Sequence, residues 1–206
     1  MAAGRSWGSR KKMDTRLKAL NLGCGEFKKN GYVNLDSNPD LHPDLLHDLN
    51  RFPYPFPDNH FDLIEADHVL EHLLNPFRVM KEMHRILVSQ GRLRIRVPHF
   101  SRGFTHPDHK SGFDLSFPYY FNPSFQGGSV GVEFELEKSR LGWFSQPYLK
   151  KTVLSKPAYF LGLGFGKIAD FFANLSPWLC SRFWCFLVGG FEEIEFHFIA
   201  KKPHSS

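Results

Sequence analysis

Two glycines and an acid near the start of the chain have the types and spacing of a nucleoside-binding site. In LNLGCGEFKKNGYVNLD, residues 20–36, an apolar run leads into a turn with Gly23 and Gly25, and a second apolar run ends at Asp36. Glycine lets the backbone approach a ligand closely and adopt positive φ angles. A carboxylate after the next strand can accept hydrogen bonds from both hydroxyls of a ribose. A GxG turn by itself is a weak signal, so the downstream residues decide its meaning.

The downstream context is an acid followed by a long run of motifs. Asp48 lies in LLHDLN, and FPDNHFDLIEADHVLEHLLNPFRVMKEMHRILVSQGRLRIRVP follows it. With these motifs, residues 17–98 closely resemble class I methyltransferases that depend on S-adenosylmethionine. The resemblance implies S-adenosylmethionine as cofactor and methyl transfer as the reaction. It also implies that Gly23, Cys24 and Gly25 lie along the methionine part of the cofactor and that Asp36 holds the ribose.

The same resemblance assigns the adenine ring and the mouth of the site. Asp48 would accept a hydrogen bond from the exocyclic amine of adenine, and Leu49 would give apolar contact. Asp67 and His68 would lie at the mouth of the site, just before Glu71–His72 at the opening of the next helix. All these positions follow strands at their carboxyl ends, where ligands bind in such sheets.

The chain departs from the family pattern in two places. Asn21 stands where an acid is usual, and no third glycine follows Gly25. Asn21 can still accept a hydrogen bond from the ammonium group of the cofactor, so we expect binding to survive. Asp36 follows Gly25 by only 11 positions, whereas a parallel crossover normally needs a dozen residues or more. The first helix is therefore expected to be very short or absent.

A second, looser resemblance covers about a dozen further residues. Methyltransferases found among surface-polysaccharide genes share GYVNLD directly after the glycine turn. They also share a PHF segment, here residues 98–100, and an HPxHK-like segment, here residues 106–110. This resemblance implies a glycan or lipid-linked glycan acceptor.

Three histidines after the predicted fifth strand are candidate catalytic residues. Methyl transfer is an in-line displacement, and a base helps if the acceptor is a hydroxyl. His99, His106 and His109 could bind substrate or take its proton, and Asp108 could orient one of them. The same set could hold zinc or iron, or could cap turns in an irregular insertion. We rank His106 and His109 ahead of His99 and predict no metal.

Short apolar runs and one clear helix make up the first half of the chain. The helix is predicted to begin with Asn75 as N-cap and Pro76 in the first turn, and to stop at Gly91. The strands that alternate with turns predict a parallel sheet; their ranges are 17–22, 32–36, 44–49, 61–66 and 92–97. Together with the resemblance, this predicts an α/β fold with a doubly wound, mostly parallel, seven-stranded, Rossmann-like sheet.

The second half predicts an antiparallel hairpin and an aromatic helical insertion. Residues 130–136 and 194–198 alternate apolar and polar side chains, as strands covered on one face do. The segment 158–191 is rich in Phe, Trp, Leu and Gly, with a helix expected over 158–175. We expect a packed helical cover on the sheet, with a membrane-surface patch as the alternative. Arg92, Arg94 and Arg96 share one strand face, where pairing with glutamates is expected.

Length and composition fit one globular domain of 206 residues. We expect a flexible leader over 1–13 and a methyltransferase domain over 14–206, in which 101–190 form a substrate-side insertion or cover. The three cysteines, which form no metal pattern, and the lack of a secretory signal predict free thiols and a cytoplasmic location.

Charge leaves the partner open, because a net charge of +5 fits nucleic acid, an anionic membrane or an acidic substrate. A nucleic-acid methyltransferase is one rival reading, but the chain has no NPPY-like tetrapeptide, no catalytic Pro-Cys pair and no appended RNA-binding module. A catalytically silent scaffold protein is another. We favour a small-molecule or glycan-type acceptor, methylated on O or N, with possible peripheral membrane contact.

Overall fold

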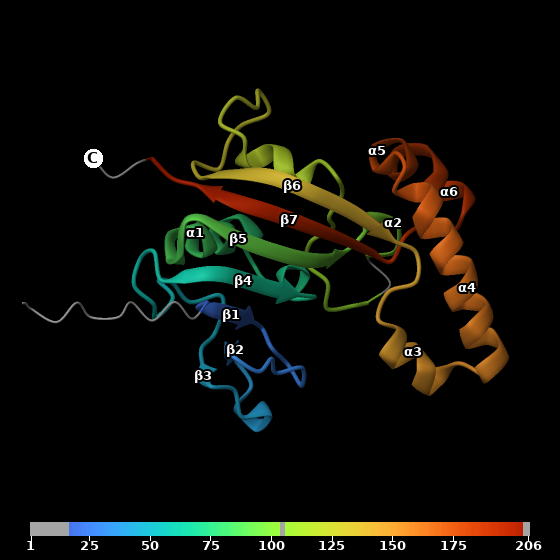
Figure 1. The fold of residues 1–206 in the computed structure, drawn as a ribbon, viewed down its shortest axis with the longest axis horizontal. Coiled ribbons are helices and arrows are strands. Elements are labelled where there is room, and N and C mark those ends of the chain that lie inside the picture. Colours follow the sequence, from blue (N-terminus) through green and yellow to red (C-terminus); the bar gives the residue numbers. More distant parts are fainter. Residues whose placement is uncertain (1–16, 104–105, 204–206) are drawn as a thin grey trace, which may run out of the picture.

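The computed structural model describes residues 17–103 and 106–203, which form one seven-stranded sheet in the order β3-β2-β1-β4-β5-β7-β6 (Figure 1). Strands β1 to β5 are parallel, and β7 is antiparallel to both of its neighbours. The predicted α/β sheet with an antiparallel C-terminal strand pair is confirmed. The predicted leader, residues 1–13, lies outside the described residues. The strands are β1 Ala19–Leu22, β2 Tyr32–Asp36, β3 Leu45–Leu46, β4 Phe61–Asp67, β5 Leu87–Pro98, β6 Glu133–Gly142 and β7 Glu193–Lys201.

The short connection after β1 is a turn without a helix, as its length predicted. Residues 23–31 hold turns only, and the chain enters β2 directly at Tyr32. β1 lies between β2 and β4, and all four of its residues are buried. This central position brings the turn after Leu22 close to the ends of both neighbouring strands.

Helix α1, Pro76–Ile86, begins as predicted but ends earlier than predicted. The Asn75 side chain accepts a hydrogen bond from the backbone N–H of Arg78, and the buried face includes Met80 and Met83. Gly91 does not end the helix, because Leu87 already has extended backbone angles and begins β5. Bulky Leu87 is fully buried as a strand residue against Phe61.

Strand β7 is inserted between β5 and β6 and carries the aromatic part of the core. Phe196 and Phe198 are buried and lie close to Phe117, Phe121 and Phe134. The alternation over 194–198 is confirmed, whereas the strand expected over 130–136 begins only at Glu133.

The three strand arginines behave largely as predicted. Arg94 Nη2 lies 2.9 Å from Glu65 Oε1, and Arg96 Nε donates to Glu195 Oε2 at 2.5 Å. Arg92 is exposed. Pairing with glutamates therefore accounts for the two arginines that are partly buried.

The aromatic segment forms helices that extend from one end of the sheet, with α4 reaching beyond the strands (Figure 1). Helix α4 begins two residues before the predicted start and ends two before the predicted end. Only Gly166 and Ala173 of α4 are buried, so the expected packed cover is mostly unpacked. No helix in the described parts of the chain is long and apolar enough to cross a membrane. The helices of this segment are α3 Pro147–Val153, α4 Lys156–Ala173, α5 Pro177–Leu179, the π-helix η4 Cys180–Trp184 and α6 Cys185–Leu187.

The remaining helical elements are single turns. They are the 3-10 helices η1 Pro39–Leu41, η2 Leu70–His72 and η3 Phe117–Phe121, and the short helix α2 Phe100–Gly103. Of these, η2 follows β4 directly and carries Glu71 and His72 to the carboxyl end of the sheet.

Candidate functional site

The glycine turn after β1 has the left-handed backbone that its sequence predicts. Gly23 has φ +66° and Gly25 has φ +52°. A Cβ atom at Gly23 would lie 2.4 Å from Val69 Cγ2, so any side chain there would collide with the segment after β4. A Cβ atom at Gly25 would meet nothing within 4 Å. Gly23 is thus required by packing, whereas Gly25 leaves open space beside the turn.

Asp36 closes this turn from the end of β2. Its Oδ2 accepts a hydrogen bond from the Gly25 N–H at 2.8 Å, and its Oδ1 accepts one from the Asn38 N–H at 3.0 Å. The parallel register of β1 and β2, with Leu22 opposite Leu35, brings the carboxylate to the turn. The structure therefore brings Asp36 and the glycine turn together as the sequence predicted.

A cavity of about 690 Å³ opens at the carboxyl ends of β1, β4 and β5. Six of the nine predicted cofactor residues line it: Asn21, Gly23, Cys24, Gly25, Asp67 and His68. The other three, Asp36, Asp48 and Leu49, are not among its lining residues. The Asp48 carboxylate accepts from the Asn50 N–H, and Leu49 is buried, with its carbonyl accepting from the Tyr54 hydroxyl.

A network of ionic side chains crosses the floor of this cavity. Lys29 Nζ donates to Glu65 Oε2 at 2.6 Å and to Asp67 Oδ2 at 2.9 Å. The other carboxylate oxygen, Asp67 Oδ1, is buried and has no hydrogen-bond partner in the part of the chain that the structure describes. Asn21 donates from Nδ2 to Asn34 Oδ1 and to the Phe27 carbonyl. The floor thus holds one buried acceptor atom that a ligand could satisfy.

His68 lies at the rim of the cavity in a strained backbone conformation, with φ +55°. Its Nε2 lies 2.8 Å from Glu193 Oε2, and its Nδ1 lies 3.4 Å from Glu71 Oε1. Burial alone would lower the pKa of His68, but the two carboxylates outweigh burial and raise the pKa to about 9. His68 is therefore a cation at neutral pH.

A second cavity of about 600 Å³ adjoins the first. The two share His68, Ser145, Gln146 and Leu149. The second cavity is further lined by Glu71, His72, Pro98, Arg102, His106, His109, Lys150 and Glu192. The two cavities thus share one rim, and His68 is the charged residue of that rim.

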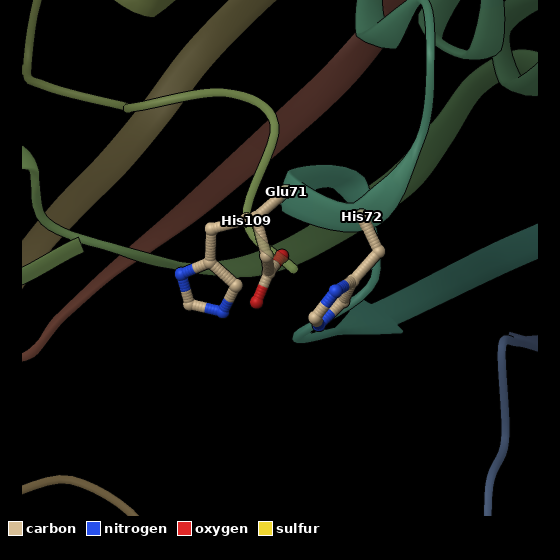
Figure 2. Close-up of side chains that lie close together, drawn as sticks. All are labelled: Glu71, His72 and His109. Atoms are coloured by element: carbon tan, nitrogen blue, oxygen red, sulfur yellow. The ribbon is translucent and has the colours of Figure 1, made fainter. Parts of the chain in front are cut away.

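The predicted histidines separate into two groups. His106 and His109 line the second cavity with their rings stacked at 4.9 Å between centroids, and the His72 ring lies 4.9 Å from that of His109. Figure 2 shows the Glu71 carboxylate between the His72 and His109 rings.

His99 lies elsewhere and lines neither cavity. It is fully buried, with Nδ1 2.7 Å from Ser101 Oγ and Nε2 2.8 Å from Ser181 Oγ. Burial lowers the pKa of His99 to about 4. The ranking of His106 and His109 ahead of His99 agrees with this placement.

Several residues at the site were not anticipated from the sequence. Residues 144–149, which follow β6 and include the start of α3, line one or both cavities, and the Tyr148 ring packs on that of Phe27 at 4.8 Å. Glu192 pairs with Lys150 and Arg102 in the second cavity. Glu193 and His68 are 125 positions apart. For the contacts of Glu192 and Glu193, the only signal in the sequence was that two adjacent acids stand at the start of the alternating run 194–198.

Comparisons with known proteins agree with the fold of the sheet. Residues 33–95 match the sequence model of a family described as a methyltransferase domain. No curated protein sequence matches the chain.

Three solved structures have similar folds at low sequence identity. A chain of the complex between the Haloferax volcanii Trm112 methyltransferase activator and the putative methyltransferase is 13% identical, with a TM-score of 0.54 and coverage of 96% of this chain and 87% of that one. The [4+2]-cyclase SpnF is 15% identical, with a TM-score of 0.53 and coverage of 93% and 78%. The YcgJ protein of Bacillus subtilis is 13% identical, with a TM-score of 0.51 and coverage of 91% and 93%. Taken with the strand order, these similarities show a Rossmann-like methyltransferase fold, in which residues 33–95 are similar to a methyltransferase domain.

Proposed function

We propose that this protein transfers a methyl group from S-adenosylmethionine to a small-molecule or glycan-type acceptor, on O or N. The observation that carries the proposal is the pair of adjoining cavities that share His68, Ser145, Gln146 and Leu149. Methyl transfer requires donor and acceptor to meet in line in a site that excludes water. The first cavity is suited to the donor and the second to the acceptor.

The residues of the first cavity fit S-adenosylmethionine. The open space beside Gly25 admits a ligand close to the backbone, and Asp36 lies within reach of a ribose there. The unpaired Asp67 Oδ1 can accept from the ammonium group of the methionine part, and Lys29 or Arg96 can bind its carboxylate. We retain Asp48 and Leu49 as adenine contacts. The bound cofactor supplies an electrophilic methyl carbon.

The second cavity supplies groups that orient an acceptor and move its proton. His68 has a pKa of about 9, so it donates a hydrogen bond and does not act as a base. His106 and His109 line the cavity at its open side, where an imidazole can take a proton from a hydroxyl or amine. We therefore assign deprotonation of the acceptor to His106 and His109, and we assign no part in this step to His99.

A lipid-linked acceptor is supported by the surface of α4–α6. Eleven large apolar side chains there are at least half exposed: Phe160, Leu161, Phe165, Ile168, Phe171, Phe172, Leu175, Phe183, Trp184, Phe186 and Leu187. Between residues 143 and 191 the chain has five Lys or Arg residues and one acid. Aromatic side chains with flanking cations are typical of surfaces that lie on anionic lipid. We propose that this surface binds such a membrane, on its cytoplasmic side.

Vesicle sedimentation tests the membrane contact. Wild-type protein should sediment with phosphatidylserine-containing vesicles more than with phosphatidylcholine alone. Leu161→Glu with Phe171→Glu should abolish sedimentation, and the exposed Leu74→Glu, outside the helices, should not. Equal sedimentation of both variants would remove the support for a lipid-linked acceptor.

Calorimetric titration with S-adenosylhomocysteine tests the donor site. Wild-type protein should bind it and should not bind NAD, and Asp36→Ala should lose most of the affinity. Asp40→Ala is the matched control, because Asp40 is a nearby exposed acid. No binding by folded wild-type protein would refute the proposal.

Product analysis then separates catalysis from binding alone. The similarity to a cyclase shows that a shared fold does not fix the reaction. Binding of S-adenosylhomocysteine without methylation of sugars, lipid-linked glycans or copurified RNA would favour a silent scaffold. Methylated RNA would favour the nucleic-acid alternative.

A further inference from the structure

Glu71 is a charged side chain in an environment that does not satisfy it. It is fully buried, and neither carboxylate oxygen has a hydrogen-bond partner among the described residues. The cationic His68 lies 3.4 Å from Glu71 Oε1 but is held more closely by Glu193, at 2.8 Å. A buried carboxylate without hydrogen bonds costs several kcal/mol unless a cation compensates it.

Two imidazoles complete a ligand set around this carboxylate. One ligand atom each from Glu71, His72 and His109 lie within 4.8 Å of one another. Atoms bound to one zinc-sized ion in tetrahedral geometry are roughly 3.3 Å apart, so small side-chain rotations would bring the three into a common shell. Figure 2 shows the carboxylate between the two rings, one from η2 and one from the loop after β5. Glu71 and His72 are adjacent in sequence, which fixes two of the three ligands on one rigid turn.

The other acid of this cavity already has cations. Glu192 pairs with Lys150 and with Arg102 Nη1, the latter at 3.0 Å. Glu71 is thus the acid of the cavity that an added cation would compensate most.

We propose that Glu71, His72 and His109 bind a divalent first-row transition-metal ion, and that this ion binds the acceptor oxygen. Two imidazoles and one carboxylate form a facial ligand set that suits such ions and leaves positions open for substrate. This changes the expectation of no metal and draws on a different set from the His99, His106 and His109 cluster considered first. With His109 bound to the ion, His106 alone of the histidine pair takes the proton of the acceptor. The role in catalysis, though not the binding itself, rests on the methyl transfer proposed above.

The ion would activate a hydroxyl acceptor in a balanced step. Coordination lowers the pKa of the hydroxyl, and its proton passes to the imidazole of His106, whose ring stacks on that of His109. An oxygen lone pair then forms the new bond to the methyl carbon, and the carbon–sulfur bond breaks. The bonding electrons stay on sulfur, which changes from a sulfonium to a neutral thioether. The site therefore favours acceptors with a hydroxyl that can bind the ion, as sugars have.

Binding of Co²⁺ to untagged, metal-free protein tests the site directly. Equilibrium dialysis should give one ion per chain, with visible absorption bands of a nitrogen- and oxygen-bound ion. Glu71→Gln and His109→Asn should each weaken binding at least tenfold and remove the bands. His42→Asn is the matched control, since His42 is exposed and lines neither cavity.

Two further readouts separate this inference from misfolding and from the donor site. Co²⁺ should raise the Tm of wild-type protein and leave that of both ligand variants unchanged, while both variants still bind S-adenosylhomocysteine. Wild-type protein that binds S-adenosylhomocysteine but no Co²⁺, or variants that bind Co²⁺ as wild type does, would overturn the metal site alone. Co²⁺ binding without S-adenosylhomocysteine binding would instead refute the proposed reaction and leave the metal site standing.

Discussion

Acid should destabilise this protein through His99, because the folded chain holds that ring neutral. The backbone N–H of Ser101 donates to His99 Nδ1, so the proton lies on Nε2, which donates to Ser181 Oγ. Protonation would place a second N–H at Nδ1, against that donor. Burial is the main cause of the lowered pKa; Asp114 opposes it and Arg182 adds to it.

The magnitude follows from linkage between protonation and folding. The pKa falls from 6.5 in the unfolded chain to about 4 in the fold. Between these values the unfolded chain binds the proton and the fold does not, so stability is complete above pH 6.5 and is lost as pH falls. The loss due to His99 is about 2 kcal/mol at pH 5 and about 3 kcal/mol below pH 4.

Urea unfolding of wild type and His99→Gln at pH 7.5 and pH 5 measures this loss. Other groups that titrate in this range contribute to both proteins and cancel in the comparison. The variant should be less stable at pH 7.5, because it loses buried hydrogen bonds, but its loss between the two pH values should be smaller by about 2 kcal/mol. The reasoning is refuted if the two proteins lose equal stability.

Three further substitutions test the turn, the core and the ionic contacts. Gly23→Ala should lower the free energy of unfolding by about 1–3 kcal/mol through the clash with Val69, whereas Gly25→Ala should cost about 1–2 kcal/mol and chiefly weaken S-adenosylhomocysteine binding; urea unfolding with calorimetry distinguishes them. Phe121→Ala should cost about 3–5 kcal/mol in urea unfolding, because its ring is fully buried among other aromatic rings, and a cost below 1 kcal/mol would contradict that packing. Arg85→Leu should cost about 2–4 kcal/mol in the same assay, because it removes hydrogen bonds to the Tyr54 and Phe56 carbonyls and the cation that pairs with the partly buried Glu82 carboxylate; no loss of stability would contradict this.

Local patterns predicted that Asp36 lies beside the glycine turn, because these residues are close in sequence. Gly25 and Asp36 are joined by one short connection between adjacent parallel strands, so the spacing alone brings the carboxylate to the turn. The absent helix after β1 followed from the same count of residues. The contact of His68 with Glu193 could not be predicted in this way, because it depends on β7 inserting beside β5.

Periodicity was less informative where it did not identify the packing partner. Leu87 fits the apolar face of α1 as well as the interior of the sheet. In the structure it is buried opposite Phe61 and therefore belongs to strand β5. In α4, apolar side chains occur on all sides, so the pattern could not show that only Gly166 and Ala173 would be buried. The Glu71, His72 and His109 set combines an adjacent pair with a distant residue, and only the loop after β5 brings them together.

The position of β7 has a consequence for how the protein is made. Residues 193–201 pair with both β5 and β6. During synthesis, β5 and β6 must therefore wait, each with an open hydrogen-bonding edge, until these residues leave the ribosome. Open strand edges pair readily with other chains. A nascent chain stalled before Glu193 would thus expose two such edges and lack the carboxylate that holds His68, so early termination in this region should give an aggregating product rather than a partly active one.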